Sequence, residues 1–142
     1  MPDLSALFFK SLLSKVIFTG TRSDVKDIYK EFDIAVCPSH SENLGAAAES
    51  LGAGVPTVAT NIGGFPDIII DGETGYLCNA KDPTDLAAKI ISMLDDMKNA
   101  EIMALKGQQL VREVLDINNT AQAVFKAYKT ILGEKDESVI LP

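Results

Sequence analysis

The sequence predicts an α/β protein built around a parallel β-sheet, because short apolar runs alternate with segments of helical spacing over the first eighty residues. The runs VIFTG (16–20), IAVC (34–37) and VPTVA (55–59) are rich in β-branched residues and are bounded by glycine or proline. Continuous apolar runs of this kind are typical of parallel strands that are buried on both faces of a sheet. Beyond residue 80 the pattern changes to helical periodicity alone.

The elements of the α/β part follow in order. Ser23 and Asp24 cap a helix that is expected to run to about Phe32. A second helix is rich in alanine, a residue that permits close approach to a sheet, and it is stopped by Gly54. The expected strands are 16–19, 34–37, 55–59 and 76–78, the second helix spans about 45–53, and 67–70 forms a short turn of helix or strand.

The C-terminal third is expected to be helical. Asp82 and Pro83 begin a first helix, a second covers about 99–115, and a third runs from about 119 to 132. The whole chain of 142 residues is expected to form one domain. Its parts are a lead segment (1–14) that is either an amphipathic helix or a displaced strand, an α/β part (15–80), a helical part (81–133) and a frayed tail (134–142).

Composition and charge restrict the class of protein. A formal net charge of −7 argues against a nucleic-acid-binding surface but leaves a nucleotide ligand possible. No run approaches the roughly 20 apolar residues that span a bilayer, and no signal peptide is recognised. Cys37 and Cys78 lie in apolar, strand-like runs, so reduced thiols are expected rather than a disulfide or a metal site. A soluble, cytoplasmic protein is expected.

Three loops are expected to meet at one edge of the sheet. In open parallel sheets ligands bind outside the carboxyl ends of the strands. The segments at that edge are 20–23 (Gly20, Thr21, Arg22, Ser23), 38–45, which includes Ser39, and 61–65. The sequence therefore predicts a ligand site formed by these loops.

Two carboxylates, seven residues apart, flank the start of the alanine-rich helix. Glu49 lies within the helix and can accept two hydrogen bonds, which suits the vicinal hydroxyls of a ribose; a solvated helix glutamate is the alternative. Glu42 precedes the helix and can accept a hydrogen bond from a sugar hydroxyl, or simply interact favourably with the helix dipole.

Backbone groups and one arginine complete the candidate site. Asn43, Leu44 and Gly45 offer amides at a helix start, where phosphates bind, although every helix has such a start. Gly63 and Gly64 form either an anion-binding concavity or a plain turn. Arg22 either contacts a base or phosphate or is only solvated.

Other chemistries are excluded by the motifs. His40 lies between Ser39 and Ser41, but adjacent residues cannot form a nucleophile–base–orienter chain, and no G-x-S-x-G elbow is present. The sequence contains no cluster of metal-ligand residues, P-loop or G-x-G-x-x-G. No metal and no cofactor are expected.

The strings VIFTGTR and DIAVCPSHSENLGAAAESLGAGVPTVATNIGGFPDIIIDGETGYL carry a resemblance. In order, Glu-x6-Glu (Glu42 and Glu49), Gly-x-Pro-x-Val, Gly-Gly and Gly-Tyr-Leu resemble the donor-binding domain of retaining glycosyltransferases of the GT-B fold, family 4 type. The resemblance covers about 15–132. It departs mildly at Asn43, Leu44 and Asp67, where Gly, Phe and Glu are common. It implies a partial C-terminal GT-B domain with a Rossmann-like sheet of about four strands.

The resemblance also implies roles for the candidate residues. Glu49 matches the glutamate that holds the ribose of a nucleotide-sugar, and Glu42 matches the one against the donor sugar, for which a catalytic role has been debated. Leu44 and Gly45 match amides near the phosphates, while the 20–23 loop borders the base. A UDP- or GDP-sugar is then the substrate, transferred to a glycan, lipid or other acceptor.

The resemblance further implies that this chain lacks parts that a full GT-B enzyme has. An acceptor-binding domain and two strand–helix units of the donor domain have no counterpart here, so the chain alone is expected to be inactive. Unpaired strand edges then predict a self-associated or strand-exchanged assembly. A non-catalytic module that completes a separate acceptor-domain chain is the rival, an epimerase of related shape is a third possibility, and peripheral membrane contact is expected only through the missing parts.

Overall fold

The computed structural model describes residues 15–41 and 44–133, and it contains a parallel sheet. Its three strands are β1 (Ala35–Cys37), β2 (Thr57–Thr60) and β3 (Tyr76–Cys78), in the order β1-β2-β3. Val36 pairs in register with Val58, and Ala59 with Leu77. The expected α/β class with a parallel sheet is confirmed.

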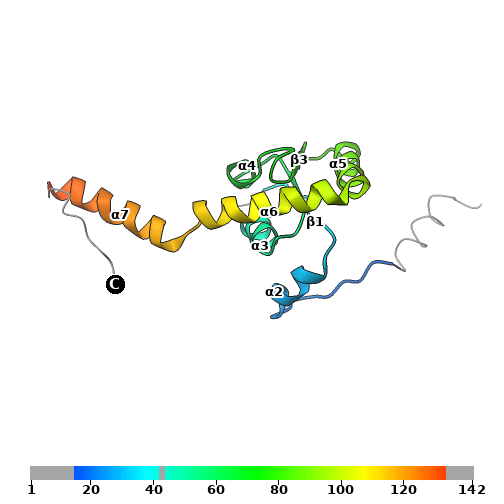
Figure 1. Ribbon diagram of the computed structural model, residues 1–142, viewed down its shortest axis with the longest axis horizontal. Helices are drawn as coiled ribbons and strands as arrows, with labels where there is room; N and C mark the ends of the chain where they lie inside the picture. The colour runs from blue at the N-terminus through cyan, green and yellow to red at the C-terminus, as the bar shows by residue number, and fades with distance from the viewer. Residues whose placement is uncertain (1–14, 42–43, 134–142) are drawn as a thin grey trace, which may run out of the picture.

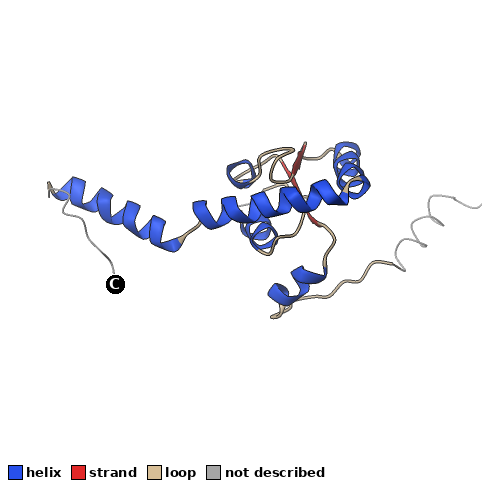
Figure 2. Ribbon diagram, in the orientation of Figure 1, coloured by secondary structure: helices blue, strands red, loops and turns tan. Residues whose placement is uncertain are grey.

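Helices and loops connect the strands, and helices follow the last strand (Figure 1). Figure 2 shows the strands as a small central element among the helices. The helices are α2 (Val25–Ile28), the 3-10 helix η1 (Tyr29–Glu31), α3 (Gly45–Gly52), α4 (Phe65–Ile68), α5 (Pro83–Asp95), α6 (Met97–Val114) and α7 (Ile117–Leu132). The expected turn at 67–70 is therefore the helix α4.

The two faces of the sheet bury two different clusters. On one face Cys37 and Ala59 contact α3, α4 and the end of α6, with Leu51 and Phe65 fully buried. On the other face Val58 packs against Met93 of α5 and against the start of α6. Every residue of β2 is buried, because β2 is the central strand and helices cover both of its faces.

The expected strand at Val16–Thr19 is wrong. This segment contains no strand, and its apolar side chains point into solvent: Ile17 is 85% exposed and Phe18 is 87% exposed. A strand requires a neighbour to satisfy its backbone groups. Among the described residues, none of the strands β1, β2 and β3 pairs with this segment. The sheet therefore has three strands in the described chain rather than four.

Helix α6 lies unusually close to its neighbours at Gly107. An ideal Cβ built on Gly107 would lie 2.6 Å from Leu51 Cδ2 of α3 and 2.7 Å from the carbonyl oxygen of Thr74. Nearby, Gln108 Nε2 donates a 2.9 Å hydrogen bond to the carbonyl of Gly52. Gly107 therefore allows α6 to contact α3 and the turn before β3 at the same time.

Replacing Gly107 by alanine is expected to destabilise the fold. The new methyl group would meet a backbone carbonyl that cannot move away cheaply, and overpacking of this kind costs about 1–3 kcal/mol. Urea denaturation measures the change in free energy of unfolding.

Gly52→Ala is the matched control. A Cβ at Gly52 meets only Val111 Cγ1, at 3.9 Å. Since alanine also favours the helix, this variant is expected to be neutral or stabilised. Equal destabilisation by both substitutions would contradict the importance of close approach at Gly107.

Candidate functional site

The boundary residue of helix α3 provides no side-chain cap. This residue is Leu44, which has a φ of 97° and whose side chain accepts no hydrogen bond from the first amides of the helix. Helices α5, α6 and α7 differ, because Asp82, Asp96 and Asp116 cap them. Gly45 and Ala46 are exposed. The first residues of α3 therefore lie at the surface. The predicted site residues Glu42 and Asn43 lie outside the described residues.

The glycine turn lies directly against this helix start. An ideal Cβ on Gly64 would lie 2.6 Å from Leu44 Cγ, so the Leu44 side chain packs onto the bare α-carbon of Gly64. Gly63 has a φ of 53°, a conformation that glycine adopts readily. Behind the turn, Thr60 Oγ1 donates a 2.7 Å hydrogen bond to the carbonyl of Ser39. The 38–45 and 61–65 loops are thus brought together.

Glu49 faces a different hollow, which we name the Glu49 crevice. It has a volume of about 670 Å³ and lies between α2 with η1 on one side and α3 on the other. Ser23, Lys26, Tyr29, Lys30, Ala48 and Glu49 are among the residues that line it. Burial raises the pKa of Tyr29, and the charge of Glu49 and a hydrogen bond to it raise this pKa further. Tyr29 and Glu49 are therefore neighbours that interact directly.

The 20–23 loop approaches the Glu49 crevice rather than the glycine turn. Ser23 lines the crevice, whereas a Cβ on Gly20 would have no heavy atom within 4 Å. The Arg22 guanidinium is paired with Asp24, with Nε 2.8 Å from Oδ1, and it holds the pKa of Asp24 below its ordinary value. The Arg22 side chain is thus engaged locally.

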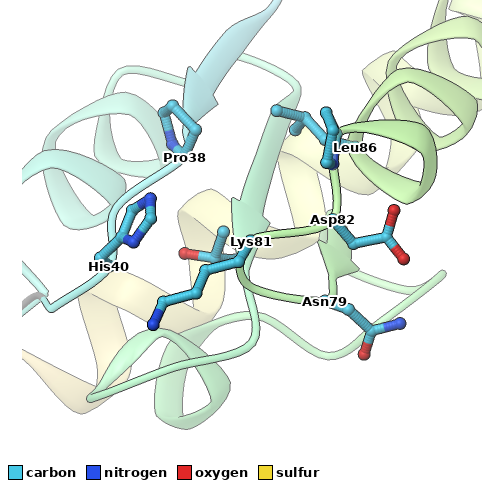
Figure 3. A pocket seen from close by; sticks show the side chains of 8 residues that line it. Pro38, His40, Asn79, Lys81, Asp82 and Leu86 are labelled. Atoms are coloured by element: carbon cyan, nitrogen blue, oxygen red, sulfur yellow. The ribbon is translucent and has the colours of Figure 1, made fainter.

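A second hollow, which we name the Lys81 cleft, lies where the three strands end (Figure 3). It has a volume of about 320 Å³ and is lined by Pro38, His40, Thr60, Asn79, Lys81, Asp82, Pro83 and Leu86. Sequence reasoning did not single out Lys81, Thr60 or Tyr29. Lys81 follows β3 by three residues, and this position at the carboxyl end of a parallel strand was the available signal.

Within residues 15–41 and 44–133, no group of three or more histidine, cysteine, aspartate or glutamate side chains is arranged to hold a metal ion. No helix in the same part of the chain combines the length and the apolar character that crossing a membrane requires.

The contact between Leu44 and Gly64 can be tested with a double-mutant cycle. Gly64→Ala is expected to destabilise the protein by about 1–3 kcal/mol, because its methyl group would displace the Leu44 side chain. In a Leu44→Gly background the obstacle is gone, so the same substitution is expected to cost little. Urea unfolding of the four proteins gives the coupling energy. Equal costs in both backgrounds would contradict the contact.

Comparison with known proteins identifies the family. The profile of the family described as "Glycosyl transferases group 1" matches residues 9–110. A glycogen synthase from Mycobacterium tuberculosis is 38% identical over 112 residues, which are 78% of this chain and 27% of that protein. This chain therefore spans about a quarter of that relative's length.

Solved structures give the same result. Anabaena HepE superposes with a TM-score of 0.78 at 23% identity, over 84% of this chain and 34% of that chain. The C-terminal domain of a group 1 glycosyltransferase (LpcC) from Francisella tularensis has a TM-score of 0.64 and 29% identity, over 82% of this chain and 66% of that domain. The predicted resemblance to the C-terminal donor domain of GT-B enzymes is confirmed, and the chain belongs to the group 1 glycosyltransferase family.

Proposed function

We propose that this protein binds a nucleoside-diphosphate sugar and forms the donor side of a glycosyl transfer to a glycan, lipid or other acceptor. The observation that carries the proposal is the exposed start of α3, where Leu44 packs against Gly64 of the glycine turn, in a chain of this family. Helix N-termini with open amides favour phosphate groups because of their unsatisfied N–H groups and their dipole. The sugar nucleotide is a substrate here and not a cofactor.

Different residues of the site would contact different parts of the ligand. The amides at Leu44 and Gly45, with the Gly63–Gly64 turn opposite, would contact the phosphates. Glu49 would accept hydrogen bonds from the ribose hydroxyls, and the 20–23 loop would border the base beside the Glu49 crevice. Glu42, with Asn43 and Ser39 in the same loop, would lie against the donor sugar.

A uridine or guanosine nucleotide is the expected donor class. HepE, whose fold this chain shares, has been solved in complex with UDP and in complex with UDP-glucose. This supports a UDP-sugar as the first ligand to test.

Titration with UDP, GDP and ADP, followed by amide chemical shifts, tests the proposal. At millimolar nucleotide we expect shifts at Gly45, Ala46 and Glu49, because these residues line the proposed phosphate and ribose positions. Glu49→Ala is expected to abolish binding, since the ribose hydroxyls lose their acceptor. Glu42→Ala should weaken the intact sugar nucleotide more than the diphosphate.

Glu73→Ala is the matched control. Glu73 is an exposed glutamate in the turn before β3, and its removal changes the net charge by the same amount as the loss of Glu49. It should leave the shifts unchanged. No perturbation around Glu49 at any of the three nucleotides would contradict donor binding.

The acceptor side of the reaction is part of the proposal. Glycosyl transfer needs an acceptor site and a closed cleft that excludes water. We propose that transfer takes place only when an acceptor domain is joined to this donor domain.

The second candidate function is that of a non-catalytic module that completes a separate acceptor-domain chain. It is favoured by α7, which buries none of its residues in the described structure and leaves Ile117, Tyr128 and Ile131 exposed.

We also propose a cytoplasmic location, because buried thiols such as Cys78 suit a reducing compartment.

We further propose that two copies of the chain associate through strand edges. Strand β1 lies at the edge of the sheet, and the side chain of Val36 is 37% exposed there. The exposed segment 16–19 has strand-forming residues but no strand partner among the described residues. A second copy can supply the missing partner, because edge strands and extended apolar segments pair readily.

Light scattering measures this association. The wild-type protein is expected to be dimeric, and Ile17→Lys to shift it toward monomer because a charge on an edge segment opposes pairing. Ile102→Lys, on the exposed face of α6, should not change the mass. A monodisperse wild-type monomer would overturn the proposal.

A further inference from the structure

The Lys81 cleft brings together residues that follow all three strands of the sheet. Pro38 and His40 come after β1, Thr60 ends β2, and Asn79 comes after β3. The carboxyl ends of parallel strands are where open α/β sheets bind ligands. None of the donor-site roles proposed above uses His40 or Lys81, so the cleft has no assigned ligand.

Lys81 is held over this cleft by a rare backbone conformation. Its φ is 63°, whereas most of the described residues with positive φ are glycines. Left-handed backbone is disfavoured for a residue with a Cβ, and such strain persists where surrounding structure and function require it. Among the described residues, the Lys81 ammonium forms no ion pair. The ion pairs in this part of the chain join Arg22, Lys30 and Lys89 to aspartates.

The acid in the cleft is already engaged. Asp82 Oδ1 accepts hydrogen bonds from the amides of Thr84 and Asp85, at 3.0 Å each, and so caps α5. In Figure 3 the Asp82 carboxylate and the Asn79 carboxamide lie on one side of the cleft, and His40 and the Lys81 ammonium lie on the other. Thr60 Oγ1 is engaged with the Ser39 carbonyl. The side with His40 and Lys81 therefore presents donors and a positive charge.

We propose that Lys81 and His40 bind an oxyanion, a phosphate or a carboxylate, carried by the sugar acceptor. An ammonium and an imidazole are suited to such a group, and hydrogen bonds to charged groups are the stronger ones. The acceptor assignment rests on the proposed function: His40 belongs to the 38–45 loop that would contact the donor sugar, so a molecule held in the Lys81 cleft lies beside the reacting end of the donor. The oxyanion site itself rests only on the cleft.

Three sugars that differ only in the group at carbon 6 test which chemical group the cleft binds. The full chain is titrated with glucose 6-phosphate, glucuronate and glucose, and the amide shifts of His40, Asn79 and Lys81 are followed. We expect saturable shifts with the phosphate, the carboxylate or both, and none with neutral glucose. Equal shifts with all three sugars, or no shifts with any, would overturn the oxyanion site.

Substitutions at Lys81 separate binding from turn formation. Lys81→Gly removes the ammonium and relieves the positive-φ strain, so it is expected to weaken anion binding about tenfold while raising the midpoint of thermal unfolding. Lys81→Arg should retain binding. Lys106→Ala, which removes an exposed lysine of α6, should leave binding unchanged. If Lys81→Gly binds the anion as well as the wild type, Lys81 is only a turn residue and the inference is wrong.

UDP binding distinguishes failure of this inference from failure of the proposed function. The shifts at Gly45 and Glu49 with UDP should be the same in Lys81→Gly and wild type. If UDP does not bind while glucose 6-phosphate does, the oxyanion site stands and its assignment to an acceptor is overturned. If UDP binds and no anionic sugar does, the donor site stands and the inference made here is overturned.

Discussion

The close approach of α6 at Gly107 is the constraint on which the rest of the structure depends. This contact places α6 against Leu51 of α3 and against the Thr74 carbonyl before β3, so one helix packs against both elements at once. Thr74 Oγ1 in turn accepts a 2.8 Å hydrogen bond from the amide of Ile70 after α4. Helix α6 thus supports the packing behind the candidate site, while the contact between Leu44 and Gly64 joins the start of α3 to the glycine turn.

Buried hydroxyl groups fix the other side of α3. Ser50 Oγ lies 2.9 Å from Thr57 Oγ1, which joins the helix to the central strand of the sheet. Ser50 also lies within hydrogen-bond distance of the carbonyl of Ala47, and Thr57 of that of Val55. Polar groups in such a core cost free energy unless they are paired, so this arrangement specifies one orientation of the helix. Glu49 then points away from the core and into the Glu49 crevice because its neighbour Ser50 points inward.

Local signals predicted most of the fold. The strand at Tyr76–Cys78 is a short apolar run, α3 starts at Gly45, and an aspartate caps α5. Each of these signals depends only on residues that are close together in the sequence. The strand expected at Val16–Thr19 failed because strand formation depends on a partner as well as on composition. The family resemblance supplied what propensity could not, namely the ordered set of motifs around α3.

The site was less predictable because its geometry depends on distant pairs. Tyr29 and Glu49 are twenty residues apart, and nothing in either segment indicates that they interact. The positive φ of Leu44 and Lys81 is likewise invisible in composition, since both residue types normally avoid that conformation.

The two walls of the Glu49 crevice differ in how firmly they are held. Its α3 wall belongs to the core, whereas α2 and η1 bury no residue at all. Segments with few buried contacts open at a small fraction of the global unfolding free energy, so amide hydrogen exchange should be fast in α2 and slow in β2. For the nucleotide proposed to bind in this crevice, restricting the motion of α2 would cost conformational entropy and lower the affinity.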